Sequence, residues 1–255
     1  MPIHYGDKAL NFMTISSPLG TQIPQASGYA YGQKMAGNEA VTICYFGEGA
    51  ASEGDFHAGV NMAAVLNCPV IFFCRNNGYA ISTPSEEQFA GDGIASRGIG
   101  YGVKTIRVDG NDPLAVFAAT QEARRIALAE MCPVLIEAMT YRLAAHSTSD
   151  DPTGYRSRDE EDKWRAKDPI ARMANWLTHK GWFDEKQNKA KVDKARQDVL
   201  AALKVSETIP ICGIEEIVED VYDSVPWHLQ DQLTSLKAHI KQYPKKYPKT
   251  SGSVR

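Results

Sequence analysis

Short apolar runs in this chain alternate with longer stretches in which apolar residues recur every three or four positions. This pattern is typical of a protein that mixes strands with helices. Residues 41–46 form one apolar run and residues 68–74 another, with Gly47-Glu48-Gly49 and a helix-like stretch between them. A strand, a glycine turn, a helix and a second strand make a βαβ unit, so the two strands are expected to be parallel and adjacent.

The rest of the chain extends this unit into a larger fold. Strands are expected at residues 103–108 and 133–143, and helices at residues 22–35, 113–131, 170–179, 184–204, 215–225 and 227–243. This order predicts an α/β protein with a doubly wound, mostly parallel sheet and a C-terminal helical extension. We expect an α/β domain over residues 1–158 and a helical region over residues 159–255 that packs on the same domain. The basic tail over residues 244–255 is expected to fray.

Composition narrows the class of protein. Of 255 residues, 43% are apolar and 23% are charged, which suits a folded domain with a sizeable core. The net charge of −3 argues against nucleic-acid binding, and no apolar run reaches the roughly 20 residues that span a bilayer. The first residues have no apolar segment of the kind that opens a signal peptide. Five cysteines without a Cys-x-x-Cys pair make zinc unexpected and fit a reducing compartment.

Polar residues follow the two strands of the βαβ unit. Glu48 comes directly after the first strand and Asn77 after the second. Because ligands of open α/β sheets bind outside the carboxyl ends of the strands, the two side chains are expected to converge there. Carboxylate and amide oxygens suit a magnesium ion that also grips a phosphate. The helix start near Ala50 and Ser52 offers N–H groups to a diphosphate, and Arg75 adds a cation.

Each motif also has a plainer interpretation. Gly47-Glu48-Gly49 alone is most often an ordinary strand-to-helix turn, and only its spacing to Asn77 makes it specific. The hydroxyl-rich loop over residues 14–22 is, by itself, best explained as a helix start with Thr21 as the N-cap. A lone histidine such as His146, in a polar loop after a strand, is usually an exposed residue without a specific role.

Four segments taken together carry a family resemblance. They are Ile15-Ser-Ser-Pro-Leu19, Phe46-Gly-Glu-Gly-Ala-Ala-Ser-Glu-Gly54, Cys74-Arg-Asn-Asn-Gly-Tyr-Ala-Ile-Ser-Thr-Pro84 and His146-Ser-Thr-Ser-Asp-Asp151. Nearly the whole chain resembles the alpha subunit of the thiamine-dependent, decarboxylating component of branched-chain 2-oxo acid dehydrogenase complexes. The resemblance implies an oxidoreductase of the thiamine diphosphate-binding fold. Such an enzyme decarboxylates branched-chain 2-oxo acids, in the degradation of Val, Leu and Ile, and reductively acylates a lipoyl group.

The resemblance also implies a ligand for each of several matched residues. Magnesium would be held by Glu48, Asn77 and the Tyr79 carbonyl. Thiamine diphosphate would contact Ser17, Leu19, Gly49, Ala50, Arg75 and His146, and His146 would handle protons as the catalytic residue. Potassium would be bound by Ser16, Pro18, Thr21 and Gln22, in place of the simple helix cap. Ser147 and Ser157 match regulatory phosphorylation positions, so a dedicated kinase and phosphatase are implied.

Partners and location follow from the same resemblance. A beta subunit would complete an alpha2-beta2 heterotetramer, which would serve a lipoyl-bearing acyltransferase core in the mitochondrial matrix, or in the cytoplasm of a bacterium. Two departures bear on this expectation. Ala144 and Ala145 replace a usual Gly-His, and roughly the first third of a typical subunit is expected to be missing. Two alternatives therefore stay open: a pyruvate-specific alpha subunit, and a truncated, non-catalytic paralogue that only binds the beta subunit.

Overall fold

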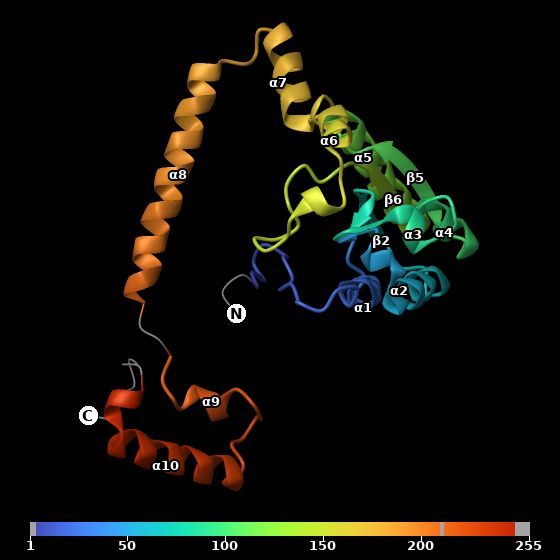
Figure 1. Ribbon diagram of the computed structural model, residues 1–255. Coiled ribbons are helices and arrows are strands. Elements are labelled where there is room, and N and C mark those ends of the chain that lie inside the picture. Colours follow the sequence, from blue (N-terminus) through green and yellow to red (C-terminus); the bar gives the residue numbers. More distant parts are fainter. Residues whose placement is uncertain (1–3, 210–211, 248–255) are drawn as a thin grey trace. The chain divides into compact units, whose positions relative to one another are not determined.

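The computed structural model describes residues 4–209 and 212–247 (Figure 1). It divides the chain into two compact units, Met1–Trp182 and Phe183–Arg255. This division lies after the boundary expected at residue 158, because helices α6 (Arg158–Arg165) and α7 (Pro169–His179) belong to the first unit. The expected packing of the C-terminal region on the α/β domain stays a prediction.

The first unit is built on a parallel sheet. Within the described residues its four strands are β1 (Thr42–Gly47), β2 (Val70–Asn76), β5 (Lys104–Asp109) and β6 (Val134–Met139), in the spatial order β1-β2-β6-β5. All three pairings are parallel, which confirms the predicted βαβ unit and the predicted fold class. Strand β6 ends at Met139, four residues earlier than predicted, because its neighbours β2 and β5 end opposite this residue, at Asn76 and Asp109.

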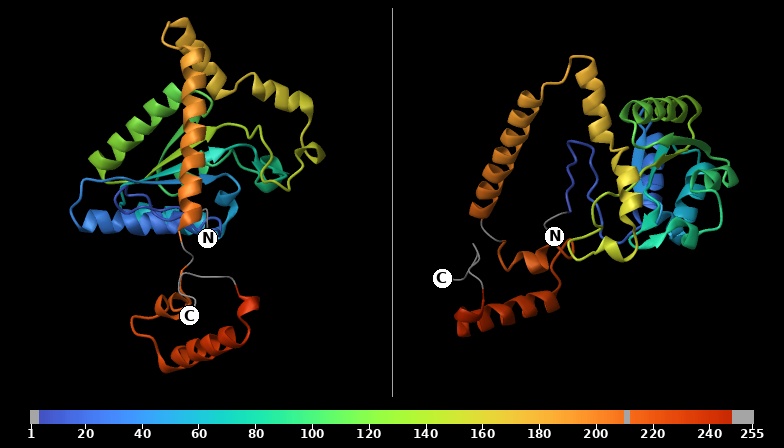
Figure 2. Two further views of the ribbon diagram at one scale, coloured as in Figure 1. Left: turned by 90° about the vertical axis from the view of Figure 1, so that its left-hand side faces the viewer. Right: turned by 45° about the horizontal axis from the view of Figure 1, so that its top comes forward.

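Helices cover both faces of this sheet (Figure 1). Helices α1 (Gln22–Met35), α2 (Gly54–Val65) and α4 (Ala95–Gly100) pack on one face, around a core that includes Phe56 and Phe72. Helix α5 (Pro113–Glu130) covers the other face with its buried alanines. Figure 2 shows α1 and α5 on opposite sides of the strands, so the sheet is doubly wound.

Aspartate side chains cap several of the helices. The Asp112 carboxylate accepts hydrogen bonds from the Leu114 and Ala115 N–H groups at 3.0 and 3.1 Å, with proline at the first helical position. Asp168 caps α7 in the same way.

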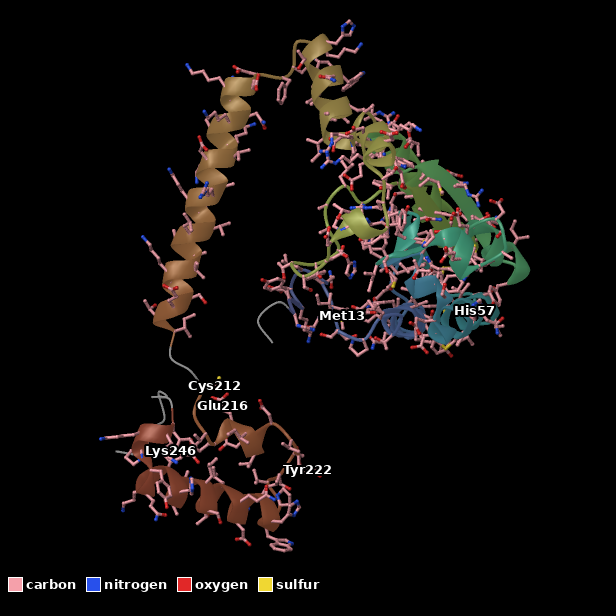
Figure 3. The ribbon with its side chains drawn as sticks, viewed as in Figure 1. Met13, His57, Cys212, Glu216, Tyr222 and Lys246 are labelled. Carbon is pink, nitrogen blue, oxygen red and sulfur yellow. The ribbon has the colours of Figure 1, made fainter. Side chains whose placement is uncertain are left out.

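On α2, His57 lies on the solvent side and its Nδ1 is 2.6 Å from the Tyr101 hydroxyl (Figure 3).

Short elements lie at the carboxyl end of the sheet. A single turn of 3-10 helix, η1 (Ala50–Ser52), follows β1. Strands β3 (Tyr79–Ala80) and β4 (Thr83–Pro84) form a small antiparallel hairpin after β2, followed by α3 (Ser85–Gln88). The turn η2 (Pro152–Gly154) precedes α6. These elements surround the point where β1 and β2 end.

The second unit is helical. It contains α8 (Glu185–Thr208), α9 (Glu216–Glu219), α10 (Trp227–Gln242) and the turn η3 (Pro244–Lys246). Helix α9 is much shorter than the helix expected over residues 215–225. Figure 3 shows Cys212 and Glu216 beside each other at its start. Tail residues 248–255, expected to fray, lie outside the described residues. Within the described ranges, no helix combines the length and apolar character needed to cross a membrane.

Candidate functional site

The Glu48 carboxylate and the Asn77 side chain meet at the carboxyl end of β1 and β2. Gly47 is opposite Arg75 in the strand register, so Glu48 leaves the sheet beside the residue before Asn77. Glu48 Oε2 accepts hydrogen bonds from the Asn77 N–H at 3.0 Å and from Asn77 Nδ2 at 3.1 Å. The structure therefore brings together the two side chains that the spacing predicted to converge.

Two oxygens of this pair are left without partners. Glu48 has no exposed surface, yet its Oε1 and the Oδ1 of Asn77 are buried atoms without a hydrogen-bond partner among the described residues. Burial raises the pKa of Glu48, against the N–H groups of Asn77, Glu48 and Tyr79 and the Arg142 guanidinium, which favour the ionised form. A bare buried carboxylate oxygen is costly, and a bound cation would satisfy it.

The second glycine of the Gly-Glu-Gly turn is required by a close contact. A Cβ on Gly49 would lie 2.8 Å from the Ala80 Cβ, so the hairpin can approach the turn only if residue 49 is glycine. The N–H groups of Ala51, Ser52 and Glu53 bond within the turn. Those of Gly49 and Ala50 come before the first of these bonds, and such leading N–H groups have no intrahelical partner. They are suited to an anion.

The remaining residues predicted for the cofactor lie in different settings. Arg75 is exposed at the end of β2, although the rest of this strand is buried. The Ser17 hydroxyl is 2.7 Å from His4 Nε2, and the Leu19 side chain is 70% exposed. Among the described residues, none of these three side chains forms a hydrogen bond or ion pair with Glu48 or Asn77.

The turn over residues 16–22 is held by side-chain oxygens. Ser16 Oγ lies 2.9 Å from Thr21 Oγ1, which also donates to the Pro18 carbonyl oxygen at 3.2 Å. Gln22 Nε2 donates to the Ser16 carbonyl oxygen at 2.9 Å and to Ser16 Oγ at 3.0 Å. Thr21 occupies the N-cap position of α1 but makes no capping hydrogen bond with its side chain. The hydroxyl groups therefore serve the turn and not the helix.

His146 lies in a long, exposed loop between β6 and α6. Its N–H donates to Asp150 Oδ2 at 2.7 Å, and the Tyr155 hydroxyl donates to the same oxygen at 2.7 Å. Arg142 Nη2 donates to the Ile81 carbonyl oxygen at 2.7 Å, which ties this loop to the hairpin beside Glu48. Ser147 is exposed, with its hydroxyl 3.2 Å from that of Ser149.

Ser157 and Tyr79 both contact helix α6. The Ser157 hydroxyl caps this helix by accepting a hydrogen bond from the Glu160 N–H at 3.2 Å. The Tyr79 hydroxyl donates to the Glu160 carboxylate, with distances of 3.0 and 3.1 Å to its two oxygens. Burial and this carboxylate together raise the pKa of Tyr79 to about 12.

Glu137 is a buried carboxylate that no motif in the sequence pointed to. It lies in β6 with no exposed surface and accepts hydrogen bonds from Asn76 Nδ2, the Ile94 and Ala95 N–H groups and Arg107 Nε at 2.8–3.0 Å. Burial raises its pKa, but these donors outweigh that effect and the pKa is lowered. A glutamate inside an otherwise apolar strand is the signal that could have identified it. Within the described ranges, no cluster of three or more His, Cys, Asp or Glu forms a further metal site.

Comparison with known proteins adds independent information. The chain is 57% identical over 249 residues to the human protein named 2-oxoisovalerate dehydrogenase subunit alpha, mitochondrial, which covers 97% of this chain and 56% of the human one. Identity to the proteins of the same name is 55% in Dictyostelium discoideum and 54% in Caenorhabditis elegans, again over 97% of this chain, with 57% and 58% of those chains covered. The chain therefore spans a little more than half the length of these relatives.

A family model covers most of the chain as well. The model described as the dehydrogenase E1 component matches residues 1–215, which include the Glu48–Asn77 pair, the turn over residues 16–22 and the His146 loop. The match extends over well more than half of the sequence. The chain belongs to the dehydrogenase E1 component family.

Proposed function

We propose that this chain is the alpha subunit of a mitochondrial, thiamine diphosphate-dependent dehydrogenase that decarboxylates branched-chain 2-oxo acids. The names of its relatives support this proposal, as does the family to which it belongs. The observation that carries it is the pair of unpartnered oxygens, Glu48 Oε1 and Asn77 Oδ1, buried at the ends of two adjacent parallel strands.

These two oxygens suit a magnesium ion. Both are hard donors, and the carboxylate supplies the negative charge that the ion needs. The Tyr79 carbonyl would be a third donor, since Tyr79 follows Asn77 by two residues and the next residue, Ala80, packs against Gly49 beside Glu48. A magnesium ion at this point would hold the carboxylate ionised against the cost of its burial.

Thiamine diphosphate would bind beside this ion. When bound, it supplies the electron sink that decarboxylation of a 2-oxo acid requires. The N–H groups of Gly49 and Ala50 and the exposed Arg75 guanidinium are donors for its diphosphate. Ser17 and Leu19 would contact the same cofactor. The His146 imidazole would hold or move a proton near the substrate.

The turn over residues 16–22 would bind potassium. The hydroxyls of Ser16 and Thr21 and the Pro18 carbonyl oxygen already gather within hydrogen-bonding distance. The Gln22 amide now donates to Ser16, and a half rotation of this amide would present its oxygen instead. Gly20 of the same turn packs against Glu53, the residue before α2.

Regulation and partners complete the proposal. Phosphorylation of the exposed Ser147 by a dedicated kinase would add roughly −1.5 to −2 charges beside His146 and would be reversed by a phosphatase. Ser157 would be a second phosphorylation position. A beta subunit in an alpha2-beta2 heterotetramer would complete the site, and a lipoyl-bearing acyltransferase would accept the acyl group.

Calorimetric titration tests the cofactor proposal directly. The chain, co-expressed with a beta subunit, is titrated with thiamine diphosphate with and without magnesium. We expect binding heat that requires the metal. Glu48→Gln should lose this heat, and Glu122→Gln, at an exposed carboxylate on α5, is its matched control. Absence of heat and of turnover would favour the non-catalytic paralogue and would contradict the proposal.

Turnover assays test the substrate. The same assembly is given 2-oxoisovalerate or pyruvate, with lipoylated acyltransferase domain as acceptor. We expect a higher kcat/KM for 2-oxoisovalerate, because the chain carries His146-Ser-Thr-Ser-Asp-Asp151 and its relatives are named for that substrate. A preference for pyruvate would support the pyruvate-specific alternative instead.

A further inference from the structure

The Tyr79 side chain is held by residues far from it in the sequence. Its hydroxyl donates to both Glu160 oxygens, and Glu160 belongs to α6, 81 positions later. Its ring packs edge-on against Tyr141 at 6.2 Å between centroids and lies tilted against Tyr155 at 5.8 Å. The side chain is thus fixed in direction by three separate contacts.

The Tyr79 main chain is part of the candidate metal site. Tyr79 begins the hairpin two residues after Asn77, which bonds Glu48, and the next residue, Ala80, packs against Gly49. Gly78, just before it, has a φ of +81°, which favours glycine, and its carbonyl oxygen accepts a hydrogen bond from the Ser85 N–H at 2.9 Å. The β3–β4 pairing and the side-chain contacts of Tyr79 therefore hold its main chain in place together.

Helix α6 is a firm support for this contact. Glu160, Glu161 and Trp164 lie on its half-buried face. Trp164 stacks on Tyr141 at 5.3 Å between centroids and 6° between planes, and Glu161 pairs with the fully buried Arg156 side chain at 3.3 Å. The Ser157 hydroxyl caps the helix at the Glu160 N–H. Glu160 is therefore held in place before it meets Tyr79.

We propose that Glu160 is a positioning residue for the metal. By binding the Tyr79 hydroxyl, it holds the Tyr79 main chain beside Glu48, so that the three oxygen donors form one arrangement for a divalent cation. This inference rests on the proposed function of the Glu48 site. It goes further by giving helix α6 a part in metal binding, through a residue that does not touch the ion.

Mn²⁺ binding tests this inference without relying on turnover. Free Mn²⁺ is measured by electron paramagnetic resonance during titration of the assembled protein with thiamine diphosphate present. We expect Tyr79→Phe and Glu160→Ala each to weaken Mn²⁺ affinity about tenfold, the effect typical of lost outer-shell contacts. Tyr79→Phe keeps the ring and its packing, so folding should be preserved. Glu160→Gln keeps a hydrogen-bond acceptor and should retain most of the affinity.

A double variant and a control separate positioning from general damage. Tyr79→Phe with Glu160→Ala should still lose only about tenfold, because the two residues act through one contact. Asp162→Asn is the matched control, an exposed carboxylate on the same helix, and should change affinity less than about twofold. Unchanged Mn²⁺ affinity in Tyr79→Phe, with normal binding by the unmodified protein, would overturn this inference alone. No Mn²⁺ binding by the unmodified protein would overturn the proposed function as well.

Discussion

Glu48 and Glu137 are both fully buried carboxylates on one parallel sheet, and their surroundings differ sharply. Each oxygen of Glu137 accepts two hydrogen bonds, from Asn76, Ile94, Ala95 and Arg107. Only one oxygen of Glu48 is bonded, by Asn77, and the other has no partner among the described residues. The pKa of Glu137 is lowered and that of Glu48 is raised.

The difference fits a structural role for Glu137 and the metal-binding role proposed for Glu48. Four donors offset the desolvation of Glu137, so this carboxylate ties α4, β2, β5 and β6 together. Asn77 orients the Glu48 side chain and leaves one of its oxygens without a hydrogen bond. A preorganised metal ligand needs this combination. Two neighbouring asparagines at the end of β2 serve the two carboxylates. The Asn76 side chain donates to Glu137, and the Asn77 side chain donates to Glu48.

The largest expected effect is on stability at Glu137. In Glu137→Gln the new NH₂ group would face donors in place of an acceptor, and Arg107 would lose its buried partner. We expect the free energy of unfolding to fall by about 3 kcal/mol, because donors that now bond a buried carboxylate would be left unsatisfied. Arg107 would keep its more exposed pair with Asp92. Hydrogen exchange of the β2 and β6 amides measures this in the first unit. Glu122→Gln, in an exposed pair with Arg125, is the control and should change little. A loss below about 1 kcal/mol would contradict the structural role.

The next effect is on metal affinity at Glu48. Glu48→Gln removes the charge but keeps the shape, so Mg²⁺ affinity should fall at least about 100-fold, or about 2.7 kcal/mol. Stability without metal should be unchanged or slightly higher, because a desolvated charge is gone. Isothermal titration with MgCl₂ in the presence of thiamine diphosphate measures the affinity. The same titration is made on Glu137→Gln, under conditions in which this variant remains folded. We expect Glu137→Gln to keep most of its Mg²⁺ affinity. Equal losses in both variants would remove the distinction between the two carboxylates.

The glycine beside Glu48 gives a smaller effect. In Gly49→Ala the added methyl would press on Ala80, so the hairpin must move and stability should fall by about 1–2 kcal/mol. Gly47→Ala is the matched control within the same tripeptide, since its nearest neighbour is the Arg75 carbonyl oxygen at 4.0 Å. Chemical unfolding of both variants measures the difference. Similar losses at the two positions would show that the Gly49–Ala80 contact is not what demands glycine.

Much of the sheet and one half of this comparison could be predicted from the sequence. Apolar runs, the glycine turn and the Asp112-Pro113 start are local signals, so β1, β2 and α5 fall close to their expected bounds. Glu48 and Asn77 converge because the carboxyl ends of adjacent parallel strands share one edge.

The other half depends on contacts between distant segments. The donors of Glu137 come from β2, α4 and β5, which no local pattern in β6 reveals. The Tyr79–Glu160 contact spans 81 positions for the same reason. Helix α9 was predicted too long, because the charged and apolar residues over 215–225 fit a helical period that continues beyond the four residues that adopt it.

The smallest expected effect is a difference in pH dependence. Because the pKa of Glu137 is lowered, its contribution to stability is present above its unfolded-state value near 4.5 and is lost as the pH falls through the folded-state value. Because the pKa of Glu48 is raised, stability falls as the pH rises through its folded-state value. Urea unfolding of the unmodified chain, Glu48→Gln and Glu137→Gln between about pH 4 and pH 8 separates the two slopes. As the pH rises, the free energy of unfolding of Glu48→Gln should increase relative to that of the unmodified chain. As the pH falls below 4.5, the loss of stability in Glu137→Gln should become smaller. Saturating Mg²⁺ and thiamine diphosphate should abolish the gain of Glu48→Gln, because the bound cation favours the ionised carboxylate. A gain that survives saturation would mean that the charge of Glu48 meets no cation at this site.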